Sequence, residues 1–139
     1  MDLVFEPFVG LGPLKFGMPE SEMELVQTTM DGIGYCDCED GKLVAFTIHS
    51  DELTHLFFSG EDILTMGKLP AALYFAGKSS DFGQAQGGSL YFMDLGCAIL
   101  QFESAFRGFL FFAREHDTGE PLKEMTLSDI QSYYEVQNA

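Results

Sequence analysis

The sequence predicts an α+β fold: two tandem units, each a helix followed by an antiparallel meander, that form one curved sheet or two abutting sheets, and then a C-terminal helix. Two observations lead to this prediction. Helix signals recur at residues 19–30, 67–77 and 126–136, and the first two are each followed by short runs rich in Phe, Tyr, Ile and Val. With 139 residues, of which 46% are hydrophobic, the chain fits a single domain with its own core.

The first helix is predicted over residues 19–30. Pro19 suits the first turn of a helix, where a missing N–H costs nothing, and the three glutamates that follow favour the positive end of the helix dipole. Met23, Val26 and Met30 recur at helical spacing and give the helix an apolar side. Asp31-Gly32 then supplies a stop signal.

Residues 33–49 predict a β-hairpin. Asp40-Gly41 is a strong signal for a type I′ turn, and the flanking runs IGYCDC and LVAFTIH are rich in strand formers. Since side chains alternate along a strand, Val44, Phe46 and Ile48 are expected on one face. Residues 53–58 are predicted to add a third strand to this meander.

The second half repeats this order. A helix is expected from Gly67 to Gly77, then a polar loop over residues 78–88, and then strands in SLYFMDLG, CAILQF and RGFLFFA. KFGMP and MGKLP, and the two LFF runs, occupy matching places in the two halves, which indicates pseudo-repeats at about 8–60 and 61–115. Residues 116–121 are predicted to be a linker, and a capping box variant at Thr126 to Asp129 begins a helix over about 126–136.

The charge of the chain is strongly negative. The formal net charge is -15, from 22 acidic and 7 basic residues, and Lys42 is the only Lys or Arg within the acidic stretch from Glu20 to Asp62. Such a field repels nucleic acid and anionic membranes and attracts basic partners. Neither a signal sequence nor a transmembrane run is recognisable, and three cysteines do not suggest a disulfide framework. We therefore expect a cytoplasmic protein that binds a basic protein.

The glycine-rich stretch at residues 10–17 does not predict a phosphate site. A Walker loop needs Gly-Lys-Ser/Thr at its end, and a dinucleotide site needs its glycines to begin a helix after a strand. Neither spacing is present, and the glutamates of the first helix would repel an anion. Gly12-Pro13 is instead expected to turn the chain, and Gly17 to let it bend toward Pro19.

No catalytic, cofactor-binding or metal-binding residue is predicted. Cys36 and Cys38 share a strand face near His49, and with His55 they offer a set of zinc ligands, but buried thiols are the better interpretation of these cysteines. Cys97 lies in an apolar run that favours an inert thiol, and no G-x-S-x-G motif occurs. The carboxylates cluster in turns and helix starts, where water keeps them from acting as general acids.

The stretch GPLKFGMPESEMELV resembles the motif that leads into the first helix of bacterial proteins of the SmpA/OmlA and β-lactamase-inhibitor-protein type. The chain also resembles small bacterial immunity proteins with a later aromatic-x-Asp-Leu-Gly strand, here residues 91–96. The resemblance covers about 15 residues well. It implies a helix-plus-sheet module, often duplicated, that acts by binding another protein.

Together these features predict a non-catalytic inhibitor, an immunity protein that occludes the active site of a cognate basic toxin domain such as a nuclease. The expected partner-binding residues are the acids of the first hairpin and of the turn after it: Asp37, Glu39, Asp40, Asp51 and Glu52. The alternative is a small-ligand-binding or sensory domain with an apolar pocket between helices and sheet. Self-association into a homodimer is left open.

Overall fold

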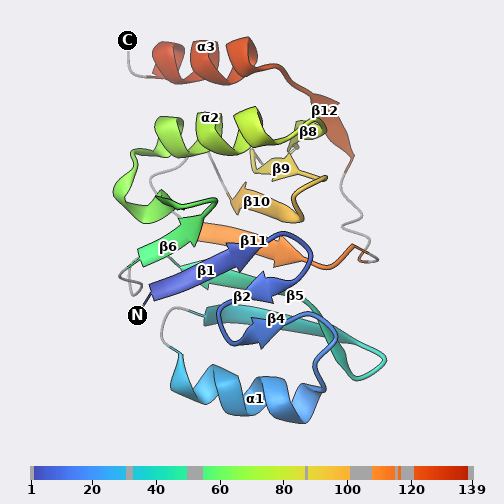
Figure 1. Ribbon diagram of the computed structural model, residues 1–139. Coiled ribbons are helices and arrows are strands. Elements are labelled where there is room, and N and C mark those ends of the chain that lie inside the picture. Colours follow the sequence, from blue (N-terminus) through green and yellow to red (C-terminus); the bar gives the residue numbers. More distant parts are fainter. Residues whose placement is uncertain are drawn as a thin grey trace.

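The computed structural model describes residues 2–30, 33–49, 55–86, 88–100, 108–114, 116 and 121–137, and it confirms the α+β class (Figure 1). Two sheets, three α-helices and the short 3-10 helix η2 (Ile63–Thr65) make up the regular structure of the described residues. Helix α1 (Glu20–Thr29) lies at one end of the molecule, and α2 (Lys68–Lys78) lies at the other end, with α3 (Leu127–Gln137) packed on its outer side.

The larger sheet has seven strands, all paired antiparallel. Its order is β12 (Leu122–Glu124), β8 (Phe82–Ala85), β9 (Leu90–Phe92), β10 (Cys97–Leu100), β11 (Gly108–Phe112), β5 (Lys42–His49) and β4 (Ile33–Glu39). The predicted hairpin is confirmed, because Asp40 and Gly41 both have positive φ, 53° and 76°, as a type I′ turn requires. Strand β4 forms one edge of this sheet.

A β-bulge changes one predicted face of the hairpin. Asp37 pairs with Ala45, but the next residue, Cys38, pairs with Leu43, so Val44 is an extra residue in β5. Leu43 therefore joins Phe46 and Ile48 in the core, in the place predicted for Val44, which is only half-buried. On the other side of β5, the Val44 carbonyl accepts a hydrogen bond of 2.7 Å from the Ala113 amide, one position beyond the Phe112–Ala45 pair.

The smaller sheet corrects the predicted meander. Its order is β3 (Leu14–Lys15), β2 (Gly10–Leu11), β1 (Asp2–Glu6), β6 (His55–Phe58) and β7 (Glu61–Asp62). The predicted third strand of the meander, β6, pairs with β1 in parallel and not with the hairpin. This pairing aligns Leu3 with Leu56 and Phe5 with Phe58, so that all four side chains are buried together. The predicted turn at Gly12-Pro13 is confirmed, since it joins β2 to β3.

The tandem duplication is not confirmed. Strands from both predicted halves share both sheets, and β11 of the second half pairs along its whole length with β5 of the first. Strand β8 lies within the predicted polar loop, and β12 directly follows the predicted linker. The C-terminal helix is confirmed at about its predicted place, and its Ile130 is fully buried.

Aromatic rings join the two sheets and α2 into one core. The ring of Phe5 lies 4.6 Å from that of Phe111 in the larger sheet, and Phe75 of α2 stacks between Phe58 and Phe92 at centroid distances of 5.2 and 5.4 Å. Such ring pairs add about 0.5–1.5 kcal/mol each to the free energy of burial. The layer between α2 and the sheets is therefore filled by stacked rings.

Asp62 links the smaller sheet to the turn that leads toward α2 through hydrogen bonds of its carboxylate. One of its oxygens accepts hydrogen bonds from the amides of Leu56 and Leu64, and the other contacts His55 Nδ1. Burial alone would raise the pKa of Asp62, but these hydrogen bonds outweigh it and lower that pKa below its usual value. The ionised carboxylate is thus the form that stabilises the fold.

We predict that Asp62→Asn lowers the free energy of unfolding by about 1 kcal/mol at neutral pH, because charge-assisted hydrogen bonds are lost. The pKa of Asp62 is lowered by folding, so its contribution is present above the unfolded pKa of about 3.9 and is lost as the pH falls below it. Urea unfolding between about pH 6 and pH 2.5 should show the two proteins converging in stability. Glu61→Gln, at an exposed neighbouring position, is the control, and a pH-independent difference for Asp62→Asn would contradict the assignment.

Candidate functional site

Three side chains form a row on the outer face of the edge strand β4. Cys36 and Cys38 pack against the core, so Asp37 and Glu39, which alternate with them, point to the opposite face. Tyr35 precedes them, where the pairing with β5 is irregular between Ile33 and Cys36. Tyr35 is 65% exposed although it is a large aromatic residue, and its amide donates a 2.7 Å hydrogen bond to Thr47 Oγ1. We call Tyr35, Asp37 and Glu39 the edge row.

The turn of the hairpin extends the edge row. Asp40 is exposed at the left-handed turn position directly after Glu39. The structure therefore brings three of the five predicted partner-binding residues, Asp37, Glu39 and Asp40, to one end of the hairpin. The other two, Asp51 and Glu52, lie outside the described residues.

His116 completes this end of the sheet and was not predicted as a site residue. Its Nδ1 lies 3.2 Å from Glu39 Oε1, and donor atoms of Asp37, Glu39 and His116 all lie within 4.8 Å of one another. The imidazole rests on the ring of Phe112 at 6.4 Å between centroids, and the His116 amide donates to the Ala113 carbonyl. Because 77 residues separate His116 from Glu39, no local sequence pattern joins them.

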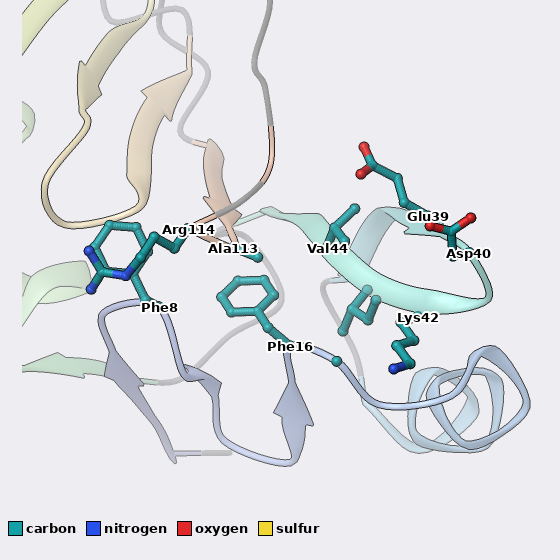
Figure 2. A pocket seen from close by; sticks show the side chains of 10 residues that line it. Phe8, Phe16, Glu39, Asp40, Lys42, Val44, Ala113 and Arg114 are labelled. Atoms are coloured by element: carbon teal, nitrogen blue, oxygen red, sulfur yellow. The ribbon is translucent and has the colours of Figure 1, made fainter.

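A groove of about 620 Å³ lies beside the hairpin (Figure 2). Apolar side chains form much of its wall: Phe8, Phe16, Val44 and Ala113. Glu39 and Asp40 stand at the hairpin end and Arg114 at the other, while Lys42 points away from the two acids. The groove therefore has an apolar middle between a negative and a positive end.

Phe8 packs against Arg114, which forms the positive end of the groove. It has a φ of 61°, which is rare for a bulky residue and costs about 1–3 kcal/mol. The guanidinium of Arg114 lies over its ring at 4.1 Å, and no carboxylate of the described residues pairs with Arg114. The ring also lies against Gly96, where a Cβ atom would come within 2.9 Å of it. Tight packing therefore keeps Phe8 in this strained conformation.

The aromatic-x-Asp-Leu-Gly stretch has a structural role at the end of α2. Asp94 accepts hydrogen bonds from the Ser79 hydroxyl and from the amide and hydroxyl of Ser80. Burial alone would raise the pKa of Asp94, but these bonds outweigh it and lower that pKa. The carboxylate thus ties the turn after β9 to the chain that leaves α2.

The cysteines are poorly suited to nucleophilic chemistry. Burial, followed by the neighbouring Cys38, raises the pKa of Cys36, and burial together with nearby Glu20, Asp37 and Glu24 raises that of Cys38. Burial raises the pKa of Cys97 well above its usual value. Since the thiolate is the nucleophile and the metal ligand, all three sites favour the inert thiol.

The alternative zinc set is not assembled in the described residues. His49 lies in β5 of the larger sheet and His55 lies in β6 of the smaller one. The only trio of close ligand atoms in the described ranges is that of Asp37, Glu39 and His116, which includes no cysteine. Among the residues that the structure describes, the side chains that line the groove carry no hydroxyl, thiol or imidazole.

We predict that Gly96→Ala is more destabilising than Gly60→Ala, a matched control. Both glycines have positive φ, 68° and 86°, so either alanine costs about 1–2 kcal/mol of backbone strain. At Gly96 the new Cβ would also lie 2.7 Å from the Phe112 carbonyl oxygen and 2.9 Å from the Phe8 ring, whereas at Gly60 it meets nothing within 4 Å. Overpacking should add roughly 1–3 kcal/mol in urea unfolding, and equal losses for the two variants would disprove the close packing of Phe8.

Helices long and apolar enough to cross a bilayer are absent from the part of the chain that the structure describes. Comparison with protein-family models, with curated proteins and with solved structures finds no match to the chain. The resemblance of residues 12–26 to inhibitor and immunity proteins therefore stays a prediction, and the site must be interpreted from its own geometry.

Proposed function

We propose that this chain is a non-catalytic inhibitor that binds a basic protein, and more specifically a bacterial immunity protein that neutralises a cognate toxin domain in the cytoplasm. The observation that carries this proposal is the edge row. An exposed tyrosine and two carboxylates lie side by side on the outer face of an edge strand, and Asp40 continues them at the turn.

This arrangement suits recognition of a protein for two reasons. Tyrosine is enriched among the residues that contribute most to binding energy, because it offers a large rigid surface with a polar tip. Carboxylates around it raise the rate of association with a positively charged partner and disfavour acidic competitors. With a net charge of -15, the whole chain adds to this attraction.

The groove next to the edge row supports occlusion rather than catalysis. Its described lining offers an apolar wall and fixed charges, and it holds no nucleophile next to a base. In our proposal, the edge row docks on the rim of the basic active-site cleft of the toxin. Apolar side chains of the partner then fill the groove against Phe16 and Val44.

A small-ligand-binding domain is the second candidate, and the groove itself is the observation that favours it. Its volume of about 620 Å³ lies within the usual range for ligand sites. The ligand would lie in this groove and not between helix and sheet, where rings of Phe58, Phe75 and Phe92 fill the space. With Arg114 unpaired among described residues, an apolar molecule with one carboxylate would fit best.

If the proposal holds, the acids of the hairpin contribute more to the rate of association with the partner than acids elsewhere on the chain do. The triple variant Asp37→Asn, Glu39→Gln, Asp40→Asn should slow association with the cognate basic toxin domain by about tenfold or more at low salt. The matched control, Glu61→Gln, Asp81→Asn, Glu124→Gln, removes the same charge from exposed positions away from the hairpin and should slow association less. Stopped-flow association at several salt concentrations gives both rates.

Tyr35→Ala should instead raise the dissociation rate by about tenfold or more, because a buried aromatic contact is lost after docking.

Equal slowing by the two triple variants, or association that does not depend on salt, would contradict a docking role for the hairpin. Stabilisation in thermal melts by small aromatic or aliphatic carboxylates, lost in Arg114→Gln, would favour the ligand-binding candidate.

A further inference from the structure

A set of nitrogen and oxygen ligands lies where β4 ends. The three donors come from two segments far apart in sequence: Asp37 and Glu39 from the edge strand and His116 from the turn after β11. An imidazole with two carboxylates is a ligand set of the kind that Zn²⁺ and related divalent ions bind in proteins. This set differs from a plain acidic cluster because the histidine supplies a nitrogen donor.

The geometry is close to what an ion requires. Ligands at about 2.0–2.2 Å from a Zn²⁺ ion lie about 3.3–4.4 Å apart, depending on the angle between them. The three donor atoms lie within 4.8 Å of one another, so small side-chain rotations would bring them onto one ion. The distance of 3.2 Å between His116 Nδ1 and Glu39 Oε1 is just below that range, so a slight separation of these two atoms would admit the ion.

The surrounding sheet positions these ligands. Asp37 pairs across the sheet with Ala45, and Ala45 pairs with Phe112, so the residue between Asp37 and the aromatic ring is a small one. The His116 imidazole lies on Phe112 and its side chain is only 14% exposed, whereas that of Glu39 is 55% exposed. The imidazole is therefore held in place by packing, and an ion would enter from the solvent side at Glu39.

From this geometry we propose that Asp37, Glu39 and His116 bind one divalent transition-metal ion of the Zn²⁺, Co²⁺ or Mn²⁺ class. Three protein donors leave at least one coordination position for water. The ion offsets the charge of the two carboxylates and clamps the segment after β11 to the hairpin. The site shares Asp37 and Glu39 with the edge row, so a bound ion would lower the negative charge of that surface. Its test needs no partner protein, and the metal site and the inhibitor function can therefore fail separately.

Isothermal titration of Zn²⁺ into the untagged chain of 139 residues tests the site. We expect one ion per chain, and a loss of affinity of at least about tenfold in both His116→Ala and Asp37→Asn. His55→Ala and Glu22→Gln remove an imidazole and a carboxylate elsewhere and should leave the affinity unchanged. Circular dichroism checks that each variant keeps its fold.

Co²⁺ spectra separate this site from the thiols on the other face of β4. The proposed ligands predict weak visible bands without sulfur-to-cobalt charge transfer, and an unchanged spectrum in the Cys36→Ser, Cys38→Ser variant. Full affinity in His116→Ala, a charge-transfer band that the cysteine variant abolishes, or no binding of Zn²⁺, Co²⁺ or Mn²⁺ at millimolar concentration would each overturn the proposal.

Discussion

The pairing of β5 with β11 is the interaction on which the rest of this structure depends. It runs from Gly108 opposite His49 to Phe112 opposite Ala45, and it joins the first hairpin to the strands of the second half. This pairing makes β4 the edge of the seven-stranded sheet, and it carries the chain after β11 to the end of the hairpin. The edge row, His116 and the groove all lie there as a result.

Local signals were enough to predict the elements whose contacts lie within a few residues. Asp40-Gly41 indicates the hairpin because its two residues adopt the positive φ values of the turn. Pro19 and the glutamates after it indicate α1, and the buried Met23 and Met30 confirm its apolar side. The parallel pairing of β1 with β6 escaped prediction, because it joins residues about fifty positions apart and neither strand shows its partner in its own pattern.

The candidate site also contains residues that the sequence predicted and residues that it did not. The acids of the edge row were predicted from their density in the sequence, and strand alternation correctly separates them from Cys36 and Cys38. His116 and Arg114 were missed because their partners, Glu39 and Phe8, are distant in sequence. The bulge at Val44 was equally invisible, since a two-residue alternation gives no sign of an extra residue. Local sequence patterns do not show which residues pair across strands that are distant in sequence, and those pairings determine the rest of the site.

We propose that the outer face of β4 and its turn form the docking surface for a basic protein. Hydrogen exchange measured on the chain alone and in complex with the cognate basic protein that this proposal requires is the decisive test. Docking through this face should slow the exchange of backbone amides over residues 33–42, with little change in α2 and α3. Protection confined to α2 and α3, with exchange of the hairpin unchanged, would contradict it.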